Sequence, residues 1–123
     1  MNIQVVPTVA CLSKQIAVTF QRVGFHRYPD APENVAYLAH PHRHMFKFKV
    51  TIDVLHDNRE IEFHTFLGWI ESQYKEVLSL DYKSCEMISD ELAELIGKEW
   101  VGRKFQIEVW EDGECGSISS YQS

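Results

Sequence analysis

The stretch HPHRHMFKFKVTIDV, residues 40–54, decides how this chain folds. From Phe46 onward its apolar side chains alternate with polar or charged ones, so the pattern repeats every two residues. A β-strand places alternate side chains on one face, and this period therefore predicts a strand. On that strand His40, His42 and His44 share the inward face with the phenylalanines, while the basic residues between them face solvent.

The upstream segment predicts a partner strand. Residues 15–25, QIAVTFQRVGF, are rich in β-branched and aromatic side chains, and they run directly into His26. Residues 27–39 contain prolines, acidic residues and an asparagine that disfavour regular structure, so we expect a long loop there. Tyr28, at the start of this loop, is expected to belong to the core.

The downstream half predicts two helices and then two strands. Apolar residues at spacings of three and four over residues 61–78 indicate an amphipathic helix. A second helix is expected to begin after Ser84 as N-cap and to end near Gly97. Alternation returns over residues 105–111, and residues 117–122 can pair back as a hairpin. The expected fold class is α+β, with the order strand, strand, helix, helix, strand, strand.

Composition narrows the functional classes. A chain of 123 residues with 45% apolar residues is sufficient for one domain, residues 1–123. The net charge of −6, without a basic patch, argues against a nucleic-acid partner. No apolar run of about 18 residues and no secretory signal is present, so we expect a cytoplasmic protein without a membrane partner. The three cysteines are far apart and form no Cys-x-x-Cys pair, which predicts free thiols.

The alternating histidines predict a metal site. Imidazoles on the inward face of a strand lose their hydrogen bonds unless something satisfies them. Zn²⁺ or another divalent metal binds neutral imidazole, and a His-x-His on one strand supplies two adjacent ligands. We therefore expect His42 and His44 to bind the metal together with His26 from the neighbouring strand. The alternative is that these histidines are solvated at a frayed strand end.

Glu111 extends the apolar face of its strand in the same way. A carboxylate in that position is costly unless it finds hydrogen-bond donors, so it either meets a ligand in a pocket or is solvated at the strand terminus. The sequence leaves both interpretations open.

These residues resemble a known family, the 6-pyruvoyl-tetrahydropterin and 6-carboxytetrahydropterin synthases, the latter belonging to the queuosine pathway. Members carry a histidine after the first strand and, some fifteen residues later, a His-Gly-His that opens the second strand. The resemblance extends from about residue 15 to the end of the chain. The matching residues are His26, His42-Arg43-His44, Ile61-Glu62-Phe63, Leu80-Asp81, Ser84-Cys85-Glu86 and Val109-Trp110-Glu111.

The resemblance implies a tunnelling fold, in which a four-stranded antiparallel sheet carries two helices on one face and subunits join into a homo-oligomer, usually a hexamer. It also implies that the substrate is a pterin or a related purine-like small molecule. Glu111 would anchor the ring, Ser84, Cys85 and Glu86 would contact the substrate, and the three histidines would hold the metal.

The chain departs from the family where protons are moved. The family's catalytic cysteine falls within residues 36–39, which read AYLA here, and the histidine expected after Asp81 is Tyr82. If the protein is an enzyme, His40, Tyr37 or Tyr82 must substitute, with Asp81 retained from the family's proton relay. The alternatives are a binder of a pterin or purine-like ligand without catalysis, and a structural oligomer stabilised by zinc.

Overall fold

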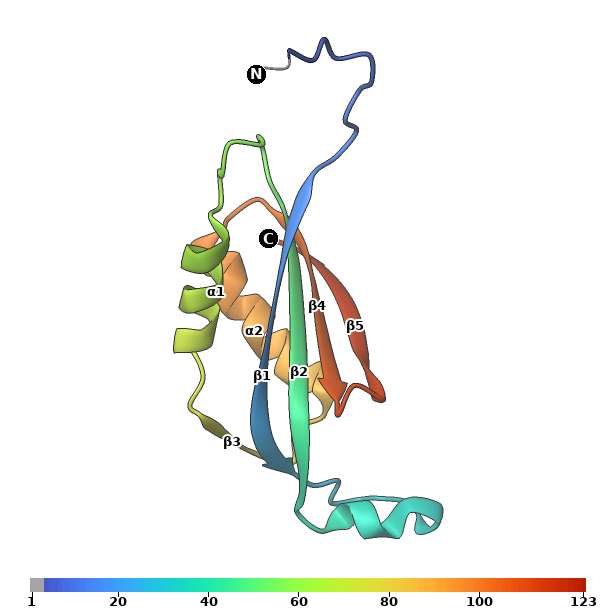
Figure 1. Cartoon of the computed structure of the whole chain (residues 1–123). Helices are drawn as coiled ribbons and strands as arrows, with labels where there is room; N and C mark the ends of the chain where they lie inside the picture. The colour runs from blue at the N-terminus through green and yellow to red at the C-terminus, as the bar shows by residue number, and fades with distance from the viewer. Residues whose placement is uncertain (1–3) are drawn as a thin grey trace.

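The computed structural model describes residues 4–123 of the chain. These residues form a five-stranded sheet with two α-helices on one face (Figure 1). The strand order across the sheet is β3-β1-β2-β4-β5. The elements along the chain are β1 (Gln15–His26), the 3₁₀-helix η1 (Glu33–Ala39), β2 (His42–Asp53), α1 (Phe63–Ser72), β3 (Val77–Asp81), α2 (Cys85–Glu99), β4 (Lys104–Glu111) and β5 (Cys115–Gln122).

The two long central strands, β1 and β2, pair antiparallel along their whole length. Their inward faces carry the apolar alternation of the sequence, and the Phe20 and Phe48 rings stack at 4.5 Å between centroids. Phe46, Phe48, Val50 and Ile52 are all essentially inaccessible to solvent. The period of two in residues 40–54 is therefore the signature of a strand buried on one face, as the sequence predicts.

Both helices cover the inward face of the sheet. α1 packs against β1 through Phe66 and Ile70, whereas α2 packs against β4 and β5. Ser84 is the N-cap of α2, and its hydroxyl accepts a hydrogen bond from the Met87 amide at 3.2 Å, which confirms the predicted start of this helix. The helix ends at Glu99, slightly beyond the predicted Gly97.

The predicted four-stranded antiparallel sheet, and with it the tunnelling fold in the order ββααββ, is wrong. A fifth strand, β3, lies between the two helices in the chain and pairs parallel with β1 at the sheet edge. The predicted helix over residues 61–78 is in fact α1 followed by a turn and the start of β3. Leu78 is one cause of the error, because its inward position satisfies both the helical spacing and the alternation of a short strand.

The predicted loop over residues 27–39 also contains more structure than expected, since its second half forms η1. The loop folds back on itself, and the Tyr28 amide donates to the Leu38 carbonyl at 2.7 Å. Tyr28 is 48% exposed, so the expectation that it belongs to the core is wrong.

The ends of several strands and the start of α2 lie together at one end of the sheet. The C-terminal ends of β1, β3 and β4 meet the N-terminal ends of β2 and α2 there (Figure 1). Within residues 4–123, none of the helices combines the length and apolarity needed to span a bilayer. His26, His42, His44 and Glu111 all lie at this common end.

The opposite end of the sheet is fastened by one ion pair. Arg103, just before β4, makes two hydrogen bonds to the Glu60 carboxylate, at 2.7 and 2.6 Å, and a third to the Asp53 carbonyl at 2.9 Å. Glu60 also accepts from the Leu55 amide at 2.8 Å, and its side chain is 17% exposed. Paired hydrogen bonds of this kind fix the approach to α1 against β2 and β4.

We expect Glu60→Gln to lower the free energy of unfolding by about 1–3 kcal/mol at neutral pH. The Arg103 hydrogen bond lowers the pKa of Glu60 from 4.5 to about 2. A carboxylate with a lowered folded pKa stabilises the protein above its unfolded pKa, and this stability is lost as the pH falls through the folded pKa. The gap between parent and variant in denaturant titrations should therefore shrink progressively below pH 4.5 and close near pH 2.

Asp57→Asn is the matched control, because the Asp57 side chain is 80% exposed and its ion pair with Lys14 is long, at 3.4 Å. It should leave stability unchanged. An equal loss in both variants would show that the Glu60 pair has no special role.

Candidate metal centre

Three histidines converge at the end of the sheet where the strands meet. The pairing of β1 with β2 sets His26 opposite His42 and Gly24 opposite His44, so the three imidazoles lie on the inward face. Their ring centroids are 4.6 to 5.2 Å apart, and one nitrogen from each ring lies within 4.8 Å of the others. The residues predicted as metal ligands are thus brought together by strand register alone.

Each ring is held by its Nδ1 atom. His26 Nδ1 lies 2.8 Å from the Lys83 carbonyl, His42 Nδ1 lies 2.8 Å from the His40 carbonyl, and His44 Nδ1 lies 2.6 Å from Oδ2 of Asp112. Since all three partners are oxygen acceptors, each Nδ1 carries the hydrogen, and the lone pair of a neutral ring is on Nε2. His26 Nε2 instead carries a hydrogen in its contact with Glu111 and would have to lose it before binding a metal. Metal-binding histidines are oriented by such contacts to their second nitrogen.

One of these nitrogens lacks a partner. His44 Nε2 is buried and makes no hydrogen bond. An imidazole lone pair withdrawn from water without a donor is costly, and a divalent cation would satisfy it. This orphaned atom, together with the three anchored Nδ1 atoms, fits a Zn²⁺ site with three imidazole ligands and room for a further ligand.

Phe46 forms the floor of the cluster. Its ring is fully buried and meets the rings of His26 and His44 edge to face, at 5.1 and 5.7 Å. Gly24 makes room for it, because a Cβ atom there would lie 2.8 Å from the Phe46 ring. The histidine rings therefore pack directly on the hydrophobic core through Phe46.

Glu111 lies beside the histidines rather than apart from them. Its Oε2 is 3.0 Å from His26 Nε2, and its Oε1 is 3.7 Å from His44 Nε2. The hydrogen bond with His26 outweighs burial and lowers the pKa of Glu111, so the carboxylate is ionised at neutral pH. Burial lowers the pKa of His26, but the hydrogen bonds with Glu111 and the Lys83 carbonyl together raise it by more than burial lowers it. The pKa of His26 is therefore above its ordinary value. Glu111 is therefore a charged acceptor at the edge of the candidate site.

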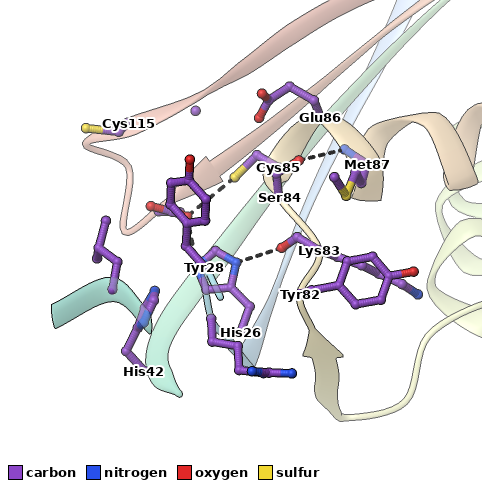
Figure 2. Close-up of a pocket in the computed structure, with 14 residues that line it drawn as sticks. His26, Tyr28, His42, Tyr82, Lys83, Ser84, Cys85, Glu86, Met87 and Cys115 are labelled. Carbon is purple, nitrogen blue, oxygen red and sulfur yellow. Dashed lines mark hydrogen bonds and ion pairs between the residues drawn. The ribbon is translucent and has the colours of Figure 1, made fainter. Parts of the chain in front are cut away.

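A cavity of about 570 Å³ opens next to this cluster. It lies between the end of the sheet and the start of α2, and Figure 2 shows His26 and His42 on one side with the Ser84–Met87 turn opposite. Its volume falls within the range of small-molecule sites, about 300–1,000 Å³. The lining residues are His26, Arg27, Tyr28, Leu38, His42, Tyr82, Lys83, Ser84, Cys85, Glu86, Met87, Glu111, Cys115 and Gly116.

All four residues predicted to bind the substrate line this cavity: Glu111, Ser84, Cys85 and Glu86. The Ser84 hydroxyl is already engaged as the N-cap of α2. Cys85 is buried, and its thiol lies 3.8 Å from Oε2 of Glu111. Burial and the nearby carboxylate raise the pKa of Cys85 to about 12, so it is a protonated donor and not a nucleophile.

The predicted proton-transfer residues are placed less favourably. Only Tyr82 lines the cavity, and it is 56% exposed. Tyr37 is 71% exposed on η1, and His40 contributes its carbonyl to His42. The Asp81 carboxylate accepts from Arg27 at 2.8 Å. Neither Asp81, Tyr37 nor His40 belongs to the cavity wall.

Sequence reasoning missed several residues of the site. Arg27, Tyr28 and Lys83 line the cavity because the loop folds back and because β3 ends beside β1. Cys115 reaches it from the β4–β5 hairpin. No local motif marks these residues, although Arg27 and Tyr28 do follow a predicted ligand directly.

We expect His44→Ala to reduce bound zinc from about one equivalent per chain to a small fraction, measured by elemental analysis of the purified protein. The reason is that His44 presents the buried Nε2 without a partner. His64→Ala is the matched control, since His64 is exposed at the start of α1. Equal zinc content in the His44→Ala variant and the parent would refute the assignment of this ligand.

No family model matches this chain, and no curated protein matches it either. The resemblance to the tetrahydropterin synthases therefore depends on the residues quoted above and remains a prediction.

Proposed function

We propose that this protein binds a divalent metal, preferably Zn²⁺, at His26, His42 and His44 and acts on a pterin or related purine-like small molecule in the adjacent cavity. In this role it would be similar to the 6-pyruvoyl-tetrahydropterin and 6-carboxytetrahydropterin synthases. The observation that carries the proposal is the buried, unpartnered Nε2 of His44 among anchored imidazoles, next to a cavity of about 570 Å³.

Glu111 supplies the recognition of the ring. Its ionised carboxylate offers two oxygens at the boundary between the histidines and the cavity. A pterin presents neighbouring N–H groups on its guanidine-like edge, and a carboxylate binds such a pair through two parallel hydrogen bonds. Glu111 would exchange its contact with His26 for this pair.

A divalent ion bound at the histidines would supply Lewis acidity toward oxygens of the ligand's side chain. The protein's own proton-transfer group would be Tyr82, which lines the cavity directly after the end of β3. In Figure 2 its ring is directed away from His26 and His42, so the side chain would have to rotate toward a bound ligand. The Cys85 thiol would donate a hydrogen bond to Glu111 and keep that carboxylate in place.

A second candidate is a binder that performs no reaction. Its support is specific: three of the four residues predicted to move protons, His40, Tyr37 and Asp81, are absent from the cavity wall, and the cavity's buried thiol is protonated. The same metal and ring contacts would then serve recognition alone. For either candidate we expect an intracellular homo-oligomer, a hexamer by the resemblance.

Glu111→Gln should retain zinc but weaken binding of neopterin to the zinc-loaded protein by at least about tenfold in calorimetric titrations, because the amide replaces one acceptor with a donor. Glu114→Gln, on the adjacent hairpin turn, is the control and should bind like the parent. If Glu111→Gln loses its zinc as well, Glu111 is a metal ligand and the proposed ring contact fails.

Turnover separates the two candidates. With dihydroneopterin triphosphate as the substrate, the enzyme candidate predicts a product detectable by mass spectrometry and a loss of at least about 100-fold in kcat for Tyr82→Phe. Tyr37→Phe, on an exposed ring outside the cavity, should leave kcat unchanged. Tight binding without any product would instead establish the binder.

A further inference from the structure

We propose that Asp112, in the turn between β4 and β5, is the positioning residue of the metal centre and sets the tautomer and orientation of His44. This inference rests on the proposed metal site and assigns a role to a residue that the sequence patterns do not single out. Asp112 lies directly after Glu111, so one short segment serves both the metal and the ligand.

The carboxylate of Asp112 is fully engaged in two directions. Oδ2 accepts from His44 Nδ1 at 2.6 Å, and Oδ1 accepts from the Met45 amide at 2.8 Å. The Asp112 amide in turn donates to the Met45 carbonyl at 2.9 Å. Asp112 is therefore bound to the same strand that carries His44, and its position relative to the ring is fixed by three hydrogen bonds.

Among the three Nδ1 anchors, Asp112 alone is a side chain. His26 and His42 are anchored on backbone carbonyls, which any sequence would provide in this fold. A carboxylate also polarises an imidazole more strongly than a carbonyl does, and it raises the basicity of the opposite nitrogen. That opposite nitrogen is the buried Nε2 of His44, which makes no hydrogen bond.

The backbone conformation of Asp112 also favours a role for its side chain at His44. Asp112 has φ 56° and Gly113 has φ 73°, so the hairpin turn begins with a non-glycine residue in the left-handed region. Asparagine and aspartate tolerate this conformation better than other side chains, but glycine adopts it without cost. Asp112 thus occupies a position where glycine would suit the turn itself, and its carboxylate serves the neighbouring histidine.

Because glycine and asparagine both tolerate the positive φ of Asp112, substitutions to these residues should retain the turn. Asp112→Gly removes both oxygens and relaxes the backbone, whereas Asp112→Asn keeps one oxygen. We would measure zinc affinity by competition with a fluorescent chelator. We expect a loss of about 10- to 100-fold for Asp112→Gly and an intermediate loss for Asp112→Asn. Glu114→Gln, in the same turn, should match the parent.

A second readout separates positioning from folding. In long-range ¹H–¹⁵N NMR spectra of the zinc-loaded parent, His44 should carry its proton on Nδ1, and Asp112→Asn should shift that resonance while those of His26 and His42 remain. Circular dichroism should show that the metal-free variants are folded like the parent. Zinc affinity in Asp112→Gly and Asp112→Asn equal to that of the parent, with His44→Ala still losing zinc, would overturn the inference alone. A parent that binds no zinc would overturn the proposed metal site as well.

Discussion

The structure depends on one constraint: polar imidazoles occupy the core face of a sheet at the place where that core ends. β2 carries His42, His44, Phe46 and Phe48 on the same side, so the apolar layer passes into a histidine layer without a change of face. The His26 ring can be buried there, and those of His42 and His44 partly buried, because their Nδ1 atoms contact oxygens, two from the backbone and one from Asp112. One nitrogen of each ring lies within 4.8 Å of the others, and Glu111 lies beside them, so we propose that a cation completes the site.

Periodicity in the sequence predicts those parts of the fold in which one face is buried over many residues. β1, β2 and β4 follow a period of two, and α2 has a clear N-cap in Ser84, so these elements are recognisable without a structure. β3 is not, because five residues are too few to distinguish alternation from helical spacing, and its parallel pairing with β1 requires a crossover that only tertiary structure shows. This single omission is what makes a mixed five-stranded sheet look like a four-stranded antiparallel one.

The residues of the candidate site also divide into those that periodicity in the sequence predicts and those that it does not. His26, His42, His44 and Glu111 are predictable because each continues the inward face of a strand, and strand register alone brings them together. The positions of the proton-transfer candidates could not be predicted. His40, Tyr37 and Asp81 lie in or beside irregular segments, where no periodicity indicates which way a side chain points. Asp112 is missed for a similar reason: its contact with His44 spans 68 residues of sequence and depends on a left-handed turn.

A metal held by three imidazoles can be observed by X-ray absorption spectroscopy at the zinc edge on the purified, zinc-loaded protein. We expect a shell of nitrogen and oxygen scatterers at about 2.0–2.1 Å, with the outer-shell pattern of about three imidazoles and no sulfur. A sulfur shell at about 2.3 Å would instead assign the metal to one of the free cysteines, Cys11, Cys85 or Cys115, and a spectrum without imidazole scattering would contradict the histidine site altogether.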